Sequence, residues 1–233
     1  MSDVARGPVE DALEAVYGGV TAVADRPGGA DLMMLPSRCA GWTAGDVLFH
    51  QLLDARRALR TFASPAPEPP DVDDIEYWRA FSLQAGGPGA PGSQEALEHA
   101  RYVRISAAAY PPGTLAWEWR ETSAAACRAA RACPYPAVTT QGHVLRTADF
   151  TATLAVEAAV HYLDLTVGLP WASPPDAAAL ALVRRVLDGL LGSAMPGGWD
   201  DQTYALKGTG RLPVTEADRS AIGALADRLP LFG

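Results

Sequence analysis

Residues 148–169, ADFTATLAVEAAVHYLDLTVGL, decide the fold, because they form one long apolar segment that reads as a single helix. Apolar side chains surround this helix on nearly every side, so we expect it to be buried. Glu157 and His161 interrupt the apolar surface four residues apart, and that spacing puts both on one face, one turn apart. A carboxylate in a buried helix needs a partner or a metal ion.

A second predicted helix, within residues 41–60, carries His50 far upstream in the chain. Two imidazoles and one carboxylate on neighbouring helices make a three-ligand metal site that leaves a fourth position open. The competing interpretation is a structural pair of the carboxylate with His161, Arg146 or Arg120. Short ligand pairs have many false positives, so spacing alone leaves both interpretations open.

Other polar residues near these helices have candidate supporting roles. Asp164 follows His161 by three residues and can orient a ligand histidine through its second ring nitrogen, or else pair with an arginine or with solvent. Asp46 stands at the third position of the helix that Thr43 is expected to cap. His99, and equally the lone histidine at position 143, is expected to pack or to lie at the surface.

The pattern along the chain predicts a mainly α protein. A metal-binding helical bundle over residues 1–168 would precede a small α+β region over residues 169–233. The glycine- and proline-rich stretch QAGGPGAPGS is expected to be a flexible loop, and Gln141-Gly142 to turn a short hairpin. The predicted helices cover 8–26, 43–62, a short piece within 74–83, 93–110, 111–133, 147–168, 173–195 and 215–229, with strands around a glycine turn over 201–214.

Composition excludes several classes of protein. The chain has 233 residues, of which 48% are hydrophobic, and no stretch is apolar and long enough to span a membrane. The first residues lack the apolar run of a signal peptide, so we expect a cytoplasmic protein. A net charge of −8 with no basic stripe argues against nucleic acid. Three cysteines without a CxxC pair make a disulfide framework or a thiolate zinc site improbable.

Three stretches resemble a known family. SRCAGWTAGDVLFHQLLDA (37–55) is similar to the Cys-x-Gly-Trp-Thr turn and histidine helix that begin the mycothiol-dependent maleylpyruvate isomerase N-terminal domain. Residues 148–169 resemble the later helix of that family, with its Glu-x-x-x-His-x-x-Asp pattern. KGTGRLPVTEADRSAIGALADRLPLF (207–232) looks like the C-terminal region of actinobacterial members. The wider grouping is the DinB-like superfamily of four-helix-bundle metalloproteins.

The resemblance implies a DinB-like four-helix bundle in which His50, Glu157 and His161 bind a divalent metal, zinc before others. The fourth position would take water or a thiolate, with mycothiol as the thiol cosubstrate. Arg211 is the best candidate for the family's substrate-binding arginine, although it can equally be a structural residue in a turn. Asp164 completes the catalytic candidates.

Three functions follow as hypotheses. The first is a thiol-dependent isomerase or transferase that acts on a small electrophilic molecule, as a monomer or homodimer. The second is a hydrolase using zinc-bound water, for which Asp164 or Asp46 would be the base. The third is a non-catalytic module that binds a metal or ligand. Two histidines and one carboxylate also describe non-haem iron oxygenases, whose ligands usually come from a β-scaffold.

Overall fold

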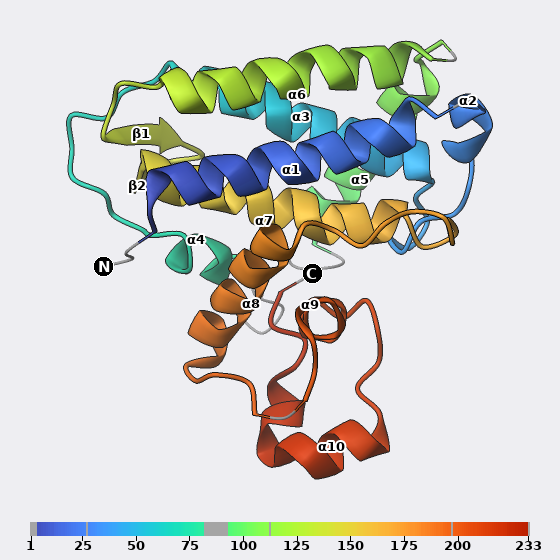
Figure 1. Ribbon diagram of the computed structural model, residues 1–233, viewed down its shortest axis with the longest axis vertical. Helices are drawn as coiled ribbons and strands as arrows, with labels where there is room; N and C mark the ends of the chain where they lie inside the picture. The colour runs from blue at the N-terminus through green and yellow to red at the C-terminus, as the bar shows by residue number, and fades with distance from the viewer. Residues whose placement is uncertain (1–3, 27, 82–92, 112, 197, 233) are drawn as a thin grey trace.

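Four long helices dominate the computed structural model, which describes residues 4–26, 28–81, 93–111, 113–196 and 198–232 (Figure 1). These helices have 19 residues each: α1 (Arg6–Ala24), α3 (Ala44–Phe62), α6 (Thr114–Ala132) and α7 (Thr147–Leu165). The predicted mainly α class is confirmed. The flexible loop expected over QAGGPGAPGS lies, apart from its last residue, outside the described residues.

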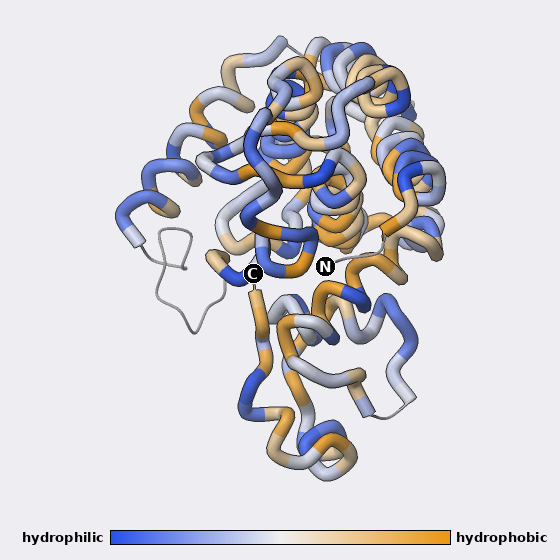
Figure 2. Tube along the Cα trace, turned by 90° about the vertical axis from the view of Figure 1, so that its left-hand side faces the viewer, coloured by the Kyte–Doolittle hydropathy of each residue, from blue (hydrophilic) through white to orange (hydrophobic). Residues whose placement is uncertain are grey.

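The long helices pack as a bundle in which α1 and α3 each contact both α6 and α7. Apolar and polar residues are interspersed along the helical tubes in Figure 2, and α1, α3 and α6 each bury only part of their surface. In α7 every residue except Ala148 and Glu157 is buried, which confirms the burial predicted from its sequence. None of the helices in the described part of the chain is both long and apolar enough to cross a membrane.

Helix α3 begins at a capping box, as its sequence predicts. Thr43 Oγ1 accepts a hydrogen bond from the Asp46 backbone N–H at 3.2 Å, and the Asp46 carboxylate accepts one from the Thr43 N–H at 2.8 Å. This start fixes the position of His50, nearly two turns into the helix. Helix α5 (Gln94–Ala108) packs against α3.

The predicted hairpin is present. Strands β1 (Ala137–Thr140) and β2 (His143–Arg146) pair antiparallel, with Thr140 opposite His143. Gln141 and Gly142 make the turn with φ angles of 47° and 81°, both in the left-handed region. Two further helices of four residues each, α2 (Gly29–Leu32) and α4 (Glu76–Arg79), lie in the connections around α3.

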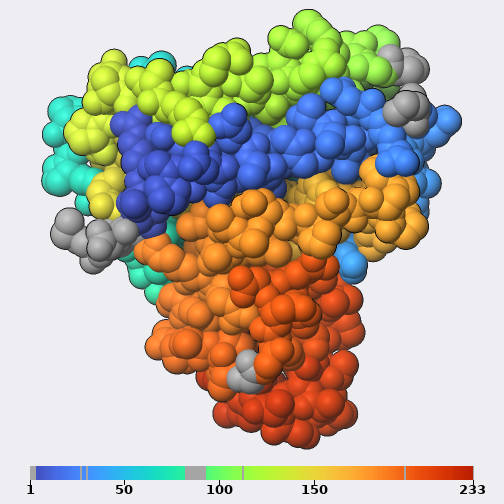
Figure 3. All heavy atoms as spheres, in the orientation of Figure 1, coloured from blue at the N-terminus to red at the C-terminus, as the bar shows by residue number. Residues whose placement is uncertain are grey.

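The C-terminal part is helical where the sequence predicts strands. Helix α8 (Ala177–Leu191) contacts α7 and α1, and α9 (Asp201–Gly208) packs on α8. The strands predicted over 201–214 are wrong, because Asp200 caps α9 through the Thr203 N–H and the α9 residues Tyr204–Leu206 are buried. The single helix predicted over 215–229 is divided at Gly223 into α10 (Glu216–Ile222) and the 3-10 helix η1 (Gly223–Arg228). In Figure 3 the C-terminal part of the chain, coloured orange to red, forms a narrower lobe below the bundle.

Candidate metal centre

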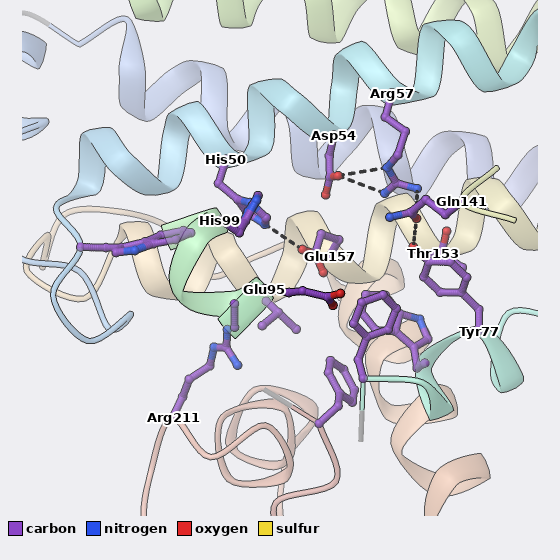
Figure 4. Close-up of a pocket in the computed structure, with 16 residues that line it drawn as sticks. His50, Asp54, Arg57, Tyr77, Glu95, His99, Gln141, Thr153, Glu157 and Arg211 are labelled. Carbon is purple, nitrogen blue, oxygen red and sulfur yellow. Dashed lines mark hydrogen bonds and ion pairs between the residues drawn. The ribbon is translucent and has the colours of Figure 1, made fainter. Parts of the chain in front are cut away.

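Helices α3 and α7 bring three side chains of the predicted metal site together. The Nε2 atoms of His50 and His161 lie 3.0 and 3.2 Å from the same oxygen, Oε1 of Glu157. One potential ligand atom from each residue lies within 4.8 Å of the other two. Figure 4 shows His50 from α3 and Glu157 from α7 facing one another. Side chains 107 positions apart in the sequence thus belong to one constellation.

The second nitrogen of each imidazole has its own partner. Nδ1 of His161 lies 2.9 Å from Oδ2 of Asp164, one turn along α7. Nδ1 of His50 lies 3.1 Å from Nε2 of His99, which comes from α5. Partners at Nδ1 fix the ring orientation and leave the Nε2 lone pair for a metal. The two Nε2 atoms and Oε1 of Glu157 therefore form an N2O donor set that suits a divalent cation of borderline softness such as zinc.

The charged side chains of this constellation stabilise one another in their ionised forms. Burial by itself would raise the pKa of Glu157, but the nearby His161 and His50 hold that pKa well below its usual range. Burial would likewise lower the pKa of His161, but the Glu157 charge and the Asp164 hydrogen bond raise it well above its usual range. The alternative arginine partners of Glu157 are engaged elsewhere, since Arg146 pairs with Asp149 and Arg120 with Asp25.

Asp164 connects the constellation to the C-terminal part of the chain. Its side chain is fully buried and accepts hydrogen bonds from Arg211 Nε at 2.9 Å and Arg211 Nη2 at 2.9 Å. Burial would raise the pKa of Asp164, but the His161 hydrogen bond and the Arg211 charge lower it. The Cys39 thiol also donates to Asp164, at 3.2 Å. Cys39, Asp164, His161 and Arg211 thus form one continuous network beside Glu157.

A cavity of about 520 Å³ opens beside this constellation, with His50 and Glu157 in its lining. The wall nearest to them includes Trp42, whose ring centroid lies 5.5 Å from that of His50. Arg211 also lines the cavity, and its Nη1 donates a hydrogen bond to the Thr209 carbonyl, so its position is compatible with both roles that its sequence leaves open, substrate contact and structural support. The full lining is Trp42, His50, Asp54, Arg57, Tyr77, Trp78, Phe81, Glu95, Ala96, His99, Gln141, Thr153, Glu157, Val160, Arg211 and Phe232.

The structure separates Asp46 from this cavity. Both the backbone N–H and the hydroxyl of Thr43 bond to its carboxylate, at 2.8 and 3.1 Å, and it lines a different cavity with Met33 and Tyr110. Asp46 therefore acts on the start of α3 and offers no base near Glu157. Asp164 is close enough, but three neighbouring donors already occupy its oxygens.

His99 has a role that sequence reasoning missed. The sequence predicts only packing or surface exposure, whereas the structure places His99 against His50 at the cavity wall. Burial and the neighbouring His50 lower its pKa. No signal in the sequence links the two residues, because they are 49 positions apart on helices whose mutual rotation the sequence does not fix. His143 fits its predicted surface role, half exposed and bonded to Asp71 at 3.1 Å.

A mainly helical fold with a two-histidine, one-carboxylate constellation beside a cavity defines the class as a helical protein with a candidate metal centre. Residues 9–166 match the family described as Mycothiol maleylpyruvate isomerase N-terminal domain. The match covers most of the chain, so the chain belongs to this family. No curated protein and no solved structure matches the chain.

Proposed function

We propose that the protein is a zinc-dependent isomerase or transferase that uses a low-molecular-weight thiol, mycothiol, on a small electrophilic substrate. One observation carries the proposal: His50 Nε2 and His161 Nε2 converge on Glu157 Oε1, and His50 and Glu157 line a cavity of about 520 Å³. Membership of the family supports mycothiol as the thiol and isomerisation or transfer as the class of reaction. The proposed division of the chain is a metal-binding bundle, residues 1–168, with a C-terminal region, residues 169–233.

In this proposal each residue has a separate task. His50, Glu157 and His161 hold the cation, which supplies the Lewis acidity that favours a thiolate over a thiol at neutral pH. Asp164 keeps Nδ1 of His161 engaged, so that Nε2 faces the cation. Arg211 bonds to Asp164 and lines the cavity, where its guanidinium would attract a carboxylate of the substrate.

The reaction balances without any further reagent. The thiolate sulfur adds to one carbon of an electron-poor double bond, and the adjacent carbon becomes a carbanion that a neighbouring carbonyl stabilises. The former carbon–carbon double bond is now a single bond. Rotation about it, followed by loss of the same thiolate, gives isomerisation. Protonation of the carbanion from solvent instead gives a stable thioether, which is thiol transfer.

The hydrolase alternative has less support. It needs a general base beside the metal, and the two carboxylates considered for that task, Asp46 and Asp164, are held by other donors. A cytoplasmic location is part of the proposal, because a thiol cosubstrate and the three free cysteines of the chain suit a reducing compartment. A binding module without catalysis stays the second rival.

Metal analysis and calorimetry test the proposal together. We expect purified protein to bind about one zinc ion per chain. Titration of the zinc form with mycothiol, in buffers of different ionisation enthalpy, should then show about one proton released per thiol bound. Thiol-dependent turnover of electron-poor alkenes should follow. Equal mycothiol binding by the metal-free protein, or hydrolysis without thiol, would overturn the proposal.

A further inference from the structure

Helix α5 has a side that the rest of the described chain leaves uncovered. Val103 is the one buried residue among its 15, and α3 is its main contact. The side chains of Leu97 and Ile105 are 58% and 60% exposed, and that of Tyr102 is 53% exposed. A helix of this length is only marginally stable in water without tertiary packing. A partner that covers these apolar side chains would therefore stabilise α5.

The uncovered side chains lie together on one face of α5, which we call the outer face. It consists of exposed residues that lie within about 100° of one another around the helix axis, namely Leu97, Glu98, Arg101, Ile105 and Ala108. The buried Val103 lies on the opposite side of the helix. The outer face thus combines two large apolar side chains with two opposite charges, all open to solvent.

Neither charge on the outer face has an ion-pair partner in the described part of the chain. Glu98 accepts a hydrogen bond from the neutral amide of Gln94 at 2.6 Å, and Arg101 has no acidic side chain to bond to. Both charges are therefore free to pair with a complementary surface. Such pairs fix the orientation and register of two surfaces, while apolar contacts supply most of the affinity.

The order of charges along α5 makes the helix complementary to a reversed copy of itself. The acids Glu95 and Glu98 precede the arginines Arg101 and Arg104. In an antiparallel pair with its twofold axis between residues 99 and 100, residues equally far from the axis lie at the same level. Glu98 then meets Arg101 of the second copy, and symmetry repeats this contact. A parallel pair would instead bring like charges to the same level.

The apolar side chains fit the same arrangement. Leu97 and Tyr102 are equally far from this axis, so each leucine lies at the level of a tyrosine ring of the other copy. The Tyr102 ring is supported from below by Phe49, with ring centroids 6.1 Å apart. One helix of about 22 Å buries less area than a standard interface, so we expect a dimer with a Kd on the order of 10–100 µM.

We propose that the outer face of α5 is a dimer interface, which packs antiparallel against the same face of a second copy of this chain. This interface goes beyond the proposed function, because it requires neither metal nor thiol. Its position matters for the cavity, since Glu95 and His99 extend from α5 into the cavity wall (Figure 4). The second copy would hold α5 in place and so stabilise that wall.

Reversing each charge tests the proposal. Glu98→Arg places four positive charges at the twofold axis, and Arg101→Glu places four negative charges there. Sedimentation velocity of metal-free protein, from about 5 to about 500 µM, should show a monomer–dimer equilibrium for the wild type and an affinity at least about tenfold weaker for each variant. An equimolar mixture of the two variants should recover the dimer, because every arginine at the axis then faces a glutamate.

The matched control is Glu68→Arg, an exposed position between α3 and α4. It changes the net charge as Glu98→Arg does, moving it from −8 toward zero, and should dimerise at least as well as the wild type. A wild type that stays monomeric, single variants that dimerise like the wild type, or a mixture that does not associate would each overturn the proposal. Weaker dimerisation of Glu68→Arg would do the same, since net charge would then be the cause. None of these outcomes depends on zinc or thiol binding.

Discussion

His161 contacts Glu157 through one ring nitrogen and Asp164 through the other. Replacement by alanine therefore removes a metal ligand and leaves both carboxylates with one partner fewer. We expect His161→Ala to abolish stoichiometric zinc binding and to lower the free energy of unfolding by about 1–3 kcal/mol. Zinc content by mass spectrometry and urea denaturation measure the two effects. His143→Ala is the control, because His143 pairs with Asp71, which is no part of the metal centre; equal zinc in both variants would contradict the ligand assignment.

Replacement of His99 tests whether the hydrogen-bond partner of a candidate ligand histidine affects zinc affinity. The His99 ring accepts from, or donates to, Nδ1 of His50 at 3.1 Å. His99→Ala frees the His50 ring to rotate, so we expect zinc affinity to fall about tenfold while one zinc still binds per chain. Competition with a chelator of known affinity measures the change. His99→Gln keeps a polar group near Nδ1 and should recover part of it; unchanged affinity in His99→Ala would return His99 to a packing role.

At this scale the sequence predicts local geometry well and distant contacts poorly. The Glu157–His161 pair and Asp164 follow from helical spacing, because residues three and four apart share a face. His50 was a candidate third ligand from the sequence, but its link to the pair was supported only by the resemblance to a family, since the sequence does not state which helices are neighbours. The contact of His99 with His50 escaped prediction for the same reason, because it depends on how α5 approaches α3.

At the scale of elements, the start of α3 controls where His50 stands. Thr43→Ala removes the acceptor for the Asp46 N–H and should cost about 1 kcal/mol, or about 2–4 °C in the thermal midpoint. Thr43→Ser keeps the hydroxyl and should retain most of the stability. Differential scanning calorimetry of the metal-free protein gives both values. A midpoint for Thr43→Ala within about 1 °C of the wild type would show that the cap contributes nothing here.

Elements were predictable where a local signal was complete. The capping box marked α3, and Gln141-Gly142 marked the hairpin. The structure of residues 201–214 was not predictable in this way. Thr203 and Tyr204 favour strands, whereas burial of Tyr204 against the rest of the chain favours α9. Tertiary packing decided that conflict, and no local pattern reveals it.

At the scale of the whole molecule, the C-terminal part completes the candidate metal centre. Arg211 lies after α9 and bonds to Asp164 in α7, and Phe232 stacks on Trp78 at the cavity. The proposed division at residue 168 therefore cuts through one network. The C-terminal region thus contributes side chains to the wall of the cavity.

A double-mutant cycle on Arg211 and Asp164 tests this interdependence. Asp164 is fully buried and the Arg211 side chain is 11% exposed, so either single change leaves a buried charge without its partner. We expect Arg211→Ala and Asp164→Asn each to cost about 3 kcal/mol or more in urea denaturation. The double variant should cost little more than one of them, giving a coupling energy of about 1–3 kcal/mol.

The control pair is Glu76–Arg79, whose side chains are half exposed and whose coupling should stay below about 1 kcal/mol. If Arg211 and Asp164 couple no more strongly than this surface pair, the C-terminal region does not hold the metal centre in place. Arg211 would then be left with substrate contact as its only task.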